Sequence, residues 1–351
     1  MKAPETKQSF LEFLPVSLFG SILGLTGLSY SLELAEKKWG FSLMLSSIIG
    51  GMSILFFLIL FILYLVKIWK YPSLVKAEFK HPVSVSFFGI FIICLLLLPG
   101  IILPYSIYLA AGTWAIGAVI MFLFAWFVLR KWLDQQQEPG NAMPAWIIPV
   151  VGTLDVPIVG HRLPITGIKE ICLLFFGIGI LFSVILLVII FSRLLFQPPL
   201  PEALKPTLMI LIGPLALAFS GYESLSGSQD IIASILYYSD LFLLLLFGSK
   251  IFLLPKCCPF RVSWWAVSFP LVACTIASFR YSANKQSIVY QFIPTILLII
   301  STCTIAYLLV QTFYKIFTNK LFLSNPLSEK ATRQLEPFKS NSDPVGAVRP
   351  G

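Results

Sequence analysis

The chain is poor in charge, because only 12% of its 351 residues are Asp, Glu, Lys or Arg. Soluble domains contain about 25% charged residues and about 45–50% apolar ones. Here 58% of the residues are hydrophobic and the mean hydropathy is +0.89. This composition excludes an ordinary water-soluble domain and predicts a chain that lies mostly in a lipid bilayer.

Residues that bind metals or form disulfides are also scarce. The two histidines, His81 and His161, have no second ligand at metal-binding spacing. The six cysteines lie almost entirely inside apolar runs or in one loop, which is not the pattern of a disulfide framework. A catalytic site needs convergent titratable groups, and the apolar segments offer too few acids and no histidine. We therefore expect no metal, no cofactor and no enzymatic activity.

Long apolar runs recur from Phe10 to Tyr314, each near the roughly 20 residues that cross a bilayer. No small-residue cleavage site follows the first run, so we interpret it as a helix and not as a signal peptide. We predict an all-α membrane protein with ten transmembrane helices, at about 11–31, 41–66, 83–103, 105–129, 145–160, 165–195, 206–222, 230–254, 262–280 and 287–314.

Lys and Arg are distributed unevenly over the loops between these runs. The side that holds both termini carries 19 of them and the other side carries 6. Cytoplasmic loops hold the excess in membrane proteins, so both termini are predicted to be cytoplasmic. The same bias accounts for most of the net charge of +9, and we expect no nucleic-acid partner. We divide the chain into a cytoplasmic segment 1–9, a transmembrane domain 10–315 and a polar, disordered cytoplasmic tail 316–351.

A proline recurs at nearly constant spacing, with separations of 67, 67, 65 and 56 residues between Pro15, Pro82, Pro149, Pro214 and Pro270. Each belongs to an odd-numbered helix or its entry, and a more uniformly apolar helix follows. This pattern predicts five helical hairpins. Kinked backbone at membrane depth must be buried in protein or must line a water-filled cavity. The odd helices should therefore form an inner ring and the even helices an outer ring. The small residues of the inner ring favour a packed core, whereas prolines at similar depth favour a pore.

Asp155 is the only carboxylate away from the ends of a predicted inner helix. An acid inside the membrane suggests a functional role, and the role expected here is that of a proton-coupling site in an anion carrier. The alternative is a structural residue near the outer mouth, hydrogen-bonded to Thr153 or paired with Arg162. Asp240, in a predicted outer helix, is expected to be a structural hydrogen-bond partner between helices.

Several motifs in these segments resemble one family. They are "EFKHPVSVSFF" at 78–88, "PAWIIPVVG" at 144–152, the polar interruption at 192–194, "PLPEALKPTLMILIGPLALAF" at 199–219 and "WWAVSFPLVACTIASFRYS" at 264–282. Together with ten helices they resemble the tellurite-resistance/dicarboxylate transporter family, which includes the slow-type anion channels of plant guard cells and the malate carriers of fungi. The resemblance covers about residues 10 to 315.

The resemblance implies a homotrimer in which each subunit has its own pore, walled by five proline-kinked helices and surrounded by five outer ones. Phe269, in "SFP", matches the phenylalanine that plugs the pore of the family's channels, and Phe87 or Phe88 matches a second aromatic constriction. An apolar constriction gates by dewetting or by ring rotation. The implied function is a channel for small anions such as nitrate and chloride.

Two other functions stay open at this stage. One is a proton-coupled transporter of malate or another C4-dicarboxylate, or of an oxyanion such as sulfite or tellurite. The other is a membrane receptor or scaffold that uses the same fold without transport. Both tails are short, so a bacterial inner membrane is the expected location.

Overall fold

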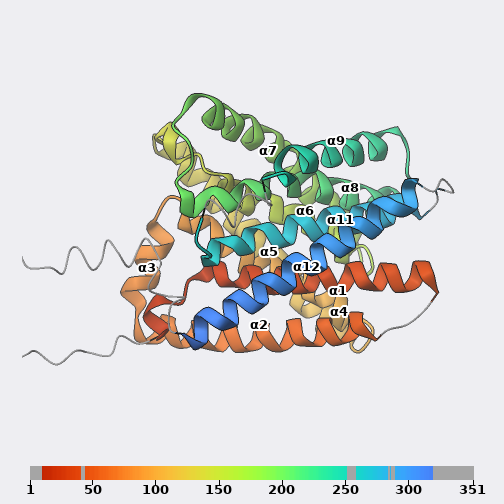
Figure 1. Cartoon of the computed structure of the whole chain (residues 1–351), viewed down its shortest axis with the longest axis horizontal. Coiled ribbons are helices and arrows are strands. Elements are labelled where there is room, and N and C mark those ends of the chain that lie inside the picture. Colours follow the sequence, from red (N-terminus) through yellow and green to blue (C-terminus); the bar gives the residue numbers. More distant parts are fainter. Residues whose placement is uncertain (1–9, 41–43, 251–257, 284, 286–288, 319–351) are drawn as a thin grey trace, which may run out of the picture.

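The computed structural model describes residues 10–40, 44–250, 258–283, 285 and 289–318. Every regular element within these ranges is a helix, and most of the long helices run along the long axis of the molecule (Figure 1). The predicted segment 1–9 and residues 319–351 of the predicted tail lie outside the described ranges.

Within the described residues, nine segments are long and apolar enough to cross a membrane. They are Val16–Trp39, Leu45–Lys70, Ser84–Ile102, Ile107–Asp134, Ile168–Phe196, Glu202–Ser226, Ile231–Gly248, Val262–Ser282 and Tyr290–Phe317, and Pro144–Gly160 is a shorter apolar helix. The chain is thus an all-helical, multi-pass membrane protein, as the composition predicts.

Every second segment combines two kinds of helix. We call these the composite segments: a 3-10 helix leads directly into an α-helix in η2(Val16–Phe19)–α1(Gly20–Trp39), η3(Ser84–Phe87)–α4(Phe88–Ile102), η5(Pro144–Ile147)–α6(Ile148–Gly160), η6(Glu202–Ile212)–α8(Gly213–Ser226) and η8(Val262–Val267)–α11(Ser268–Ser282). The intervening segments are the single helices α2(Leu45–Lys70), α5(Ile107–Asp134), α7(Ile168–Phe196), α9(Ile231–Gly248) and α12(Val289–Phe317). The short helices η1(Phe10–Phe13), α3(Pro72–Lys80) and η4(Pro139–Asn141) complete the described part.

The repeated prolines lie just before a 3-10 helix or just after one, and not in the middle of an α-helix. Pro149 and Pro214 occupy the first turns of α6 and α8, and Pro270 is the third residue of α11. Pro15 precedes η2 and Pro82 precedes η3. Amide groups in a first turn have no acceptor within the helix, so proline costs little there. Pro149, Pro214 and Pro270 therefore lie where 3-10 geometry changes to α geometry, while the kinks themselves stay a prediction.

The composite segments are buried and the single helices are exposed. In the hydrophobic window of each long span, 72–83% of the residues are buried in the composite segments and 22–39% in the single helices. The α-helices of the composite segments also contact one another in a cycle, from α1 to α4, α6, α8, α11 and back to α1. A Cβ atom on Gly27 of α1 would lie 2.2 Å from Cγ2 of Val272, so glycine is needed where α1 meets α11.

A buried ion pair joins α2, α3 and the entry to the first segment. Nζ of Lys67 donates to Oε2 of Glu78 at 3.1 Å and to the carbonyl of Leu14 at 2.6 Å. Oε2 also accepts from the hydroxyl of Tyr64 at 3.1 Å, and Oε1 accepts from the amide of Val16 at 2.9 Å. Each carboxylate oxygen of Glu78 therefore has a donor. We call this group the Lys67–Glu78 network.

Candidate functional site: a cavity bordered by all composite segments

One cavity of about 280 Å³ lies at the centre of this arrangement, and all the composite segments border it. α1 contributes Tyr30, Glu33 and Lys37, α4 contributes Leu97, α6 and the residues after it contribute Asp155, His161 and Arg162, α8 contributes Ser220, and α11 contributes Phe269 and Arg280. Residues from 27 to 280 thus meet at one place, which no local stretch of sequence defines.

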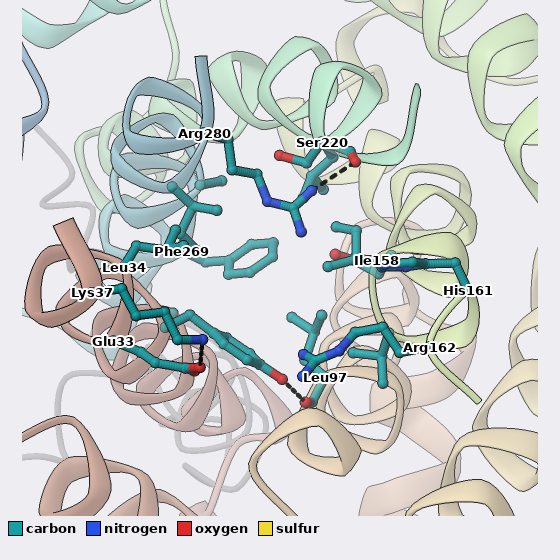
Figure 2. Close-up of a pocket in the computed structure, with 17 residues that line it drawn as sticks. Glu33, Leu34, Lys37, Leu97, Ile158, His161, Arg162, Ser220, Phe269 and Arg280 are labelled. Atoms are coloured by element: carbon teal, nitrogen blue, oxygen red, sulfur yellow. Dashed lines mark hydrogen bonds and ion pairs between the residues drawn. The ribbon is translucent and has the colours of Figure 1, made fainter. Parts of the chain in front are cut away.

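Phe269 stands in this cavity, and Figure 2 shows its ring in the central space between the surrounding helices. The preceding residue fixes the start of α11, because the hydroxyl of Ser268 donates to the carbonyl of Trp265 at 2.8 Å and to that of Gly20 at 3.4 Å. Ala273 and Ile276 continue the same helical face along the cavity. The ring is therefore a large apolar side chain on an otherwise smaller-residue wall.

Cationic side chains lie around the same cavity. Arg280 donates through Nη1 to the carbonyl of Ser220 and the hydroxyl of Ser224, both at 3.0 Å, and Oε2 of Glu223 lies 3.5 Å from the same nitrogen. Lys37 pairs with Glu33 one helical turn away. In the part of the chain that the structure describes, Arg162 has no ion pair. The cavity thus combines an apolar ring with a cation that has no ion pair among the described residues.

Asp155 borders the cavity although its own exposed fraction is 0%. Neither carboxylate oxygen has a hydrogen-bond partner among the described residues. The structural alternative, a bond to Thr153 or Arg162, is therefore wrong, because the hydroxyl of Thr153 donates to the carbonyl of Val150 at 2.7 Å. A buried acid without a partner is costly, and such groups occur where function requires them.

Asp240 has the structural setting that its place in an outer helix predicts. Its exposed fraction is 0%, its Oδ1 accepts from Sγ of Cys274 at 3.2 Å, and its Oδ2 has no hydrogen-bond partner among the described residues. This contact joins α9 to α11, and neither residue borders the cavity.

Phe87 and Phe88 do not border the cavity. The ring of Phe88 packs instead against Phe79 of α3, with centroids 5.1 Å apart, and against Tyr64 of α2 at 6.3 Å. Phe88 therefore faces α2 and α3, and a second constriction at Phe87 or Phe88 stays a prediction.

His161 ends α6 beside these cations. Its Nδ1 lies 2.8 Å from the carbonyl of Pro157. Burial lowers the pKa of His161 below the usual 6.5, and the charges of Arg280 and Arg162 lower it further against the raising effect of that hydrogen bond. The ring is thus neutral near pH 7 and gains charge only in mildly acidic solution.

The position of His161 and Arg162 escapes reasoning from sequence alone. They come after a short helix and carry no motif, so nothing in the sequence places them at the same cavity as Lys37. Arg280, in contrast, follows Phe269 by eleven residues, about three turns along one helical face, so periodicity places it on the same wall. Within the described residues, no three His, Cys, Asp or Glu side chains come together as a metal site would need.

Comparison with known proteins connects this architecture with anion transport. The sequence profile of the family described as voltage-dependent anion channel matches residues 14–313. The S-type anion channel SLAH2 of Arabidopsis thaliana is 26% identical over 333 residues, which cover 92% of this chain and 63% of that protein. For the S-type anion channel SLAH3 of the same plant the identity is 27%, and the match covers 96% of this chain and 54% of that protein. This chain thus corresponds to 54–63% of the length of these plant relatives.

A prokaryotic relative is matched over most of both chains. The tellurite resistance protein TehA homolog of Haemophilus influenzae is 26% identical over 315 residues, which cover 88% of this chain and 93% of that protein. The family membership that the motifs predict is confirmed. Because the profile match runs through all the composite segments, the chain belongs to the voltage-dependent anion channel family.

Proposed function

We propose that the protein is an anion channel in which the composite segments form an inner ring around a pore, the single helices form the outer ring, and Phe269 is the gate. The observation that carries the proposal is the position of the Phe269 ring inside a cavity that all the composite segments border. The cyclic contacts of α1, α4, α6, α8 and α11 are those of a closed wall.

The chemistry of the cavity suits an anion better than a cation. Moving a bare ion into a medium of low dielectric constant costs tens of kcal/mol, so a permeant ion must keep water or meet opposite charge. The cavity is bordered by Lys37, Arg162 and Arg280, of which Lys37 and Arg280 lie beside a glutamate. Arg162, which has no ion pair among the described residues, attracts small anions such as nitrate and chloride, and the apolar ring of Phe269 limits their passage.

The test is the current carried by Phe269→Ala in planar bilayers. Removing the ring should raise the anion current at least about tenfold, because each ~1.4 kcal/mol removed from a barrier gives that factor in rate. Phe242→Ala is the matched control, because Phe242 is 65% exposed on the outer helix α9. Equal currents from wild type and Phe269→Ala would exclude Phe269 as the gate.

The proposed second constriction needs a separate measurement. In a Phe269→Ala background, Phe87→Ala and Phe88→Ala should each be compared with the Phe242→Ala control. A further rise in current from Phe87→Ala or Phe88→Ala supports a second constriction. Unchanged currents from both variants would remove it.

Asp155 supports a second candidate function, a proton-coupled transporter of malate or of a small oxyanion. Its buried carboxyl group borders the cavity without a partner among the described residues, which is where a transported proton would be held. Liposomes with an inward pH gradient should then accumulate labelled malate, and Asp155→Asn should abolish the dependence on the gradient. Asp134→Asn, at an exposed ion pair of α5, is the control. Uptake by Asp155→Asn that still follows the pH gradient would contradict coupling through this residue.

We also propose a homotrimer in a bacterial inner membrane, with both termini cytoplasmic. The support is the resemblance of the motifs and the excess of Lys and Arg on the side of the termini. The mass of the protein in detergent tests the trimer. Reporter fusions at each end test the orientation, and a reporter that is active only outside the cytoplasm would contradict it.

A further inference from the structure

We propose that Arg280 forms an oxyanion-binding subsite in the cavity, using the guanidinium edge formed by Nε and Nη2. This inference deepens the proposed function, on which it rests, by naming the class of anion that is recognised. The class is an anion with two oxygens in one plane, such as nitrate or a carboxylate.

The guanidinium of Arg280 is held from one side only. All its hydrogen bonds among the described residues come from Nη1, which reaches Ser220, Ser224 and Glu223 of α8. Gln229 stiffens this arrangement, because its Nε2 donates to Oε1 of Glu223 at 2.7 Å and to the carbonyl of Arg280 at 2.8 Å. A guanidinium has five donors in a planar fork. The Nε–Nη2 edge is therefore positioned by the other side of the group and has no partner there.

The position of Arg280 directs this edge toward the cavity. Figure 2 shows the side chain extending from α11 into the space near the ring of Phe269, with its bond to Ser220 on the side of α8. Arg162 enters the same space from the end of α6. An anion beside Phe269 thus meets one fixed guanidinium and, from another direction, a cation that has no ion pair among the described residues.

The geometry of the edge determines which anions it prefers. Two parallel N–H groups match the two oxygens of a carboxylate or nitrate and form two charge-assisted hydrogen bonds. A halide offers a single centre and cannot pair with both donors in this way. Replacement of the guanidinium by an ammonium group keeps the charge and removes the fork, so Arg280→Lys separates recognition from simple attraction.

Equilibrium binding provides the first test, because it does not depend on transport. Purified full-length protein in detergent is titrated with nitrate, acetate and chloride, and the shift of the thermal unfolding midpoint reports binding. Arg280→Lys should weaken nitrate and acetate binding at least about tenfold and leave chloride binding within about twofold, since a lost bidentate charge-assisted pair is worth ~1.5–3 kcal/mol. Lys37→Gln is the control, because it removes a cation of the cavity that has no pair of parallel N–H donors. It should weaken the binding of all three anions by the same factor.

Anion flux provides the second test. In the Phe269→Ala background, Arg280→Lys should lower the nitrate-to-chloride permeability ratio while the order of chloride, bromide and iodide stays unchanged. If the pore instead selects anions by how easily they lose water, Arg280→Lys should change neither the nitrate-to-chloride permeability ratio nor the order of the halides. If Arg280→Lys is unstable, Arg280→Gln combined with Glu223→Gln avoids leaving the partly buried Glu223 without its cation and should give the same loss of nitrate and acetate binding.

The outcomes separate this inference from the proposed function. Nitrate and acetate binding that Arg280→Lys weakens, without any anion current, supports the subsite and contradicts the channel. Anion current with nitrate and acetate binding unaffected by the Arg280 variants supports the channel and overturns the subsite. Absence of nitrate and acetate binding in folded wild-type protein also overturns the subsite.

Discussion

A buried glutamate, Glu78, and a buried aspartate, Asp155, have opposite surroundings in this molecule. Glu78 is 8% exposed and each of its carboxylate oxygens accepts from a donor, including the ammonium group of Lys67. Asp155 is 0% exposed, and its oxygens have no partner among the described residues. Glu78 joins α2 and α3 to the first segment, whereas Asp155 borders the central cavity.

The difference supports the proposal that Glu78 serves the fold and Asp155 serves the cavity. A buried charge is tolerated structurally when an opposite charge and further hydrogen bonds surround it. The Lys67–Glu78 network meets that condition with groups from three elements. Asp155 has no such groups among the described residues, so the burial of its carboxyl group carries a desolvation cost that no neighbouring donor offsets.

Lys67→Met tests the structural half of this comparison and should have the largest effect. It leaves Glu78 buried without its cation and Leu14 without a donor, so we expect a loss of about 3–5 kcal/mol of unfolding free energy. The midpoint of thermal or denaturant unfolding in detergent measures this loss.

The control for Lys67→Met is an exposed ion pair. Lys37 and Glu33 have side chains that are 66% and 40% exposed, and Lys37→Met should change the unfolding free energy by less than about 1 kcal/mol. If Lys67→Met were as mild as Lys37→Met, the Lys67–Glu78 network would not stabilise the fold.

Asp155→Leu tests the functional half and should act in the opposite direction. Leucine has a similar shape and no polar atoms, so the substitution should raise the unfolding free energy by about 1–3 kcal/mol, the cost of a buried polar group without a partner. Anion transport should fall in the same variant, as expected for a site that is held at the expense of stability. A destabilised Asp155→Leu protein would show that Asp155 supports the fold.

The sequence predicts the helical class and the approximate apolar spans well, because both depend on local composition. Apolar runs of bilayer length give the spans, and the Gly, Ser and Pro content of alternate runs distinguishes segments that are buried from those that are exposed. The positions of the prolines are informative for the same reason. Pro149, Pro214 and Pro270 lie where 3-10 helix changes to α-helix, and the kinks expected at the five prolines stay a prediction.

The site is less predictable, because it depends on which side chains from distant segments meet. Phe269 is identified through a family motif, and periodicity places Arg280 on the same face. Phe88 belongs to a motif as well, yet its ring packs on Phe79, a contact that depends on the placement of α3. That Nη1 of Arg280 is held by Ser220 and Ser224 depends on the pairing of α8 with α11, which local sequence does not specify.

His161 borders the same cavity as Asp155, and its substitution should have the smallest effect. Its pKa is lowered below 6.5, so it gains a positive charge only as the pH falls further below that value. In the Phe269→Ala background, anion current should rise about twofold between pH 7 and about pH 5, since a unit charge ~8 Å from the ion in water contributes ~0.5 kcal/mol. His161→Gln should remove this rise. Glu33, Asp155 and Glu223 lie at or beside the cavity in both proteins, so the difference between the two pH curves isolates His161. Stability changes in the other direction, because the unfolded chain binds the proton more tightly and acid therefore destabilises the fold. A pH dependence that is unchanged in His161→Gln would assign the titration to another group.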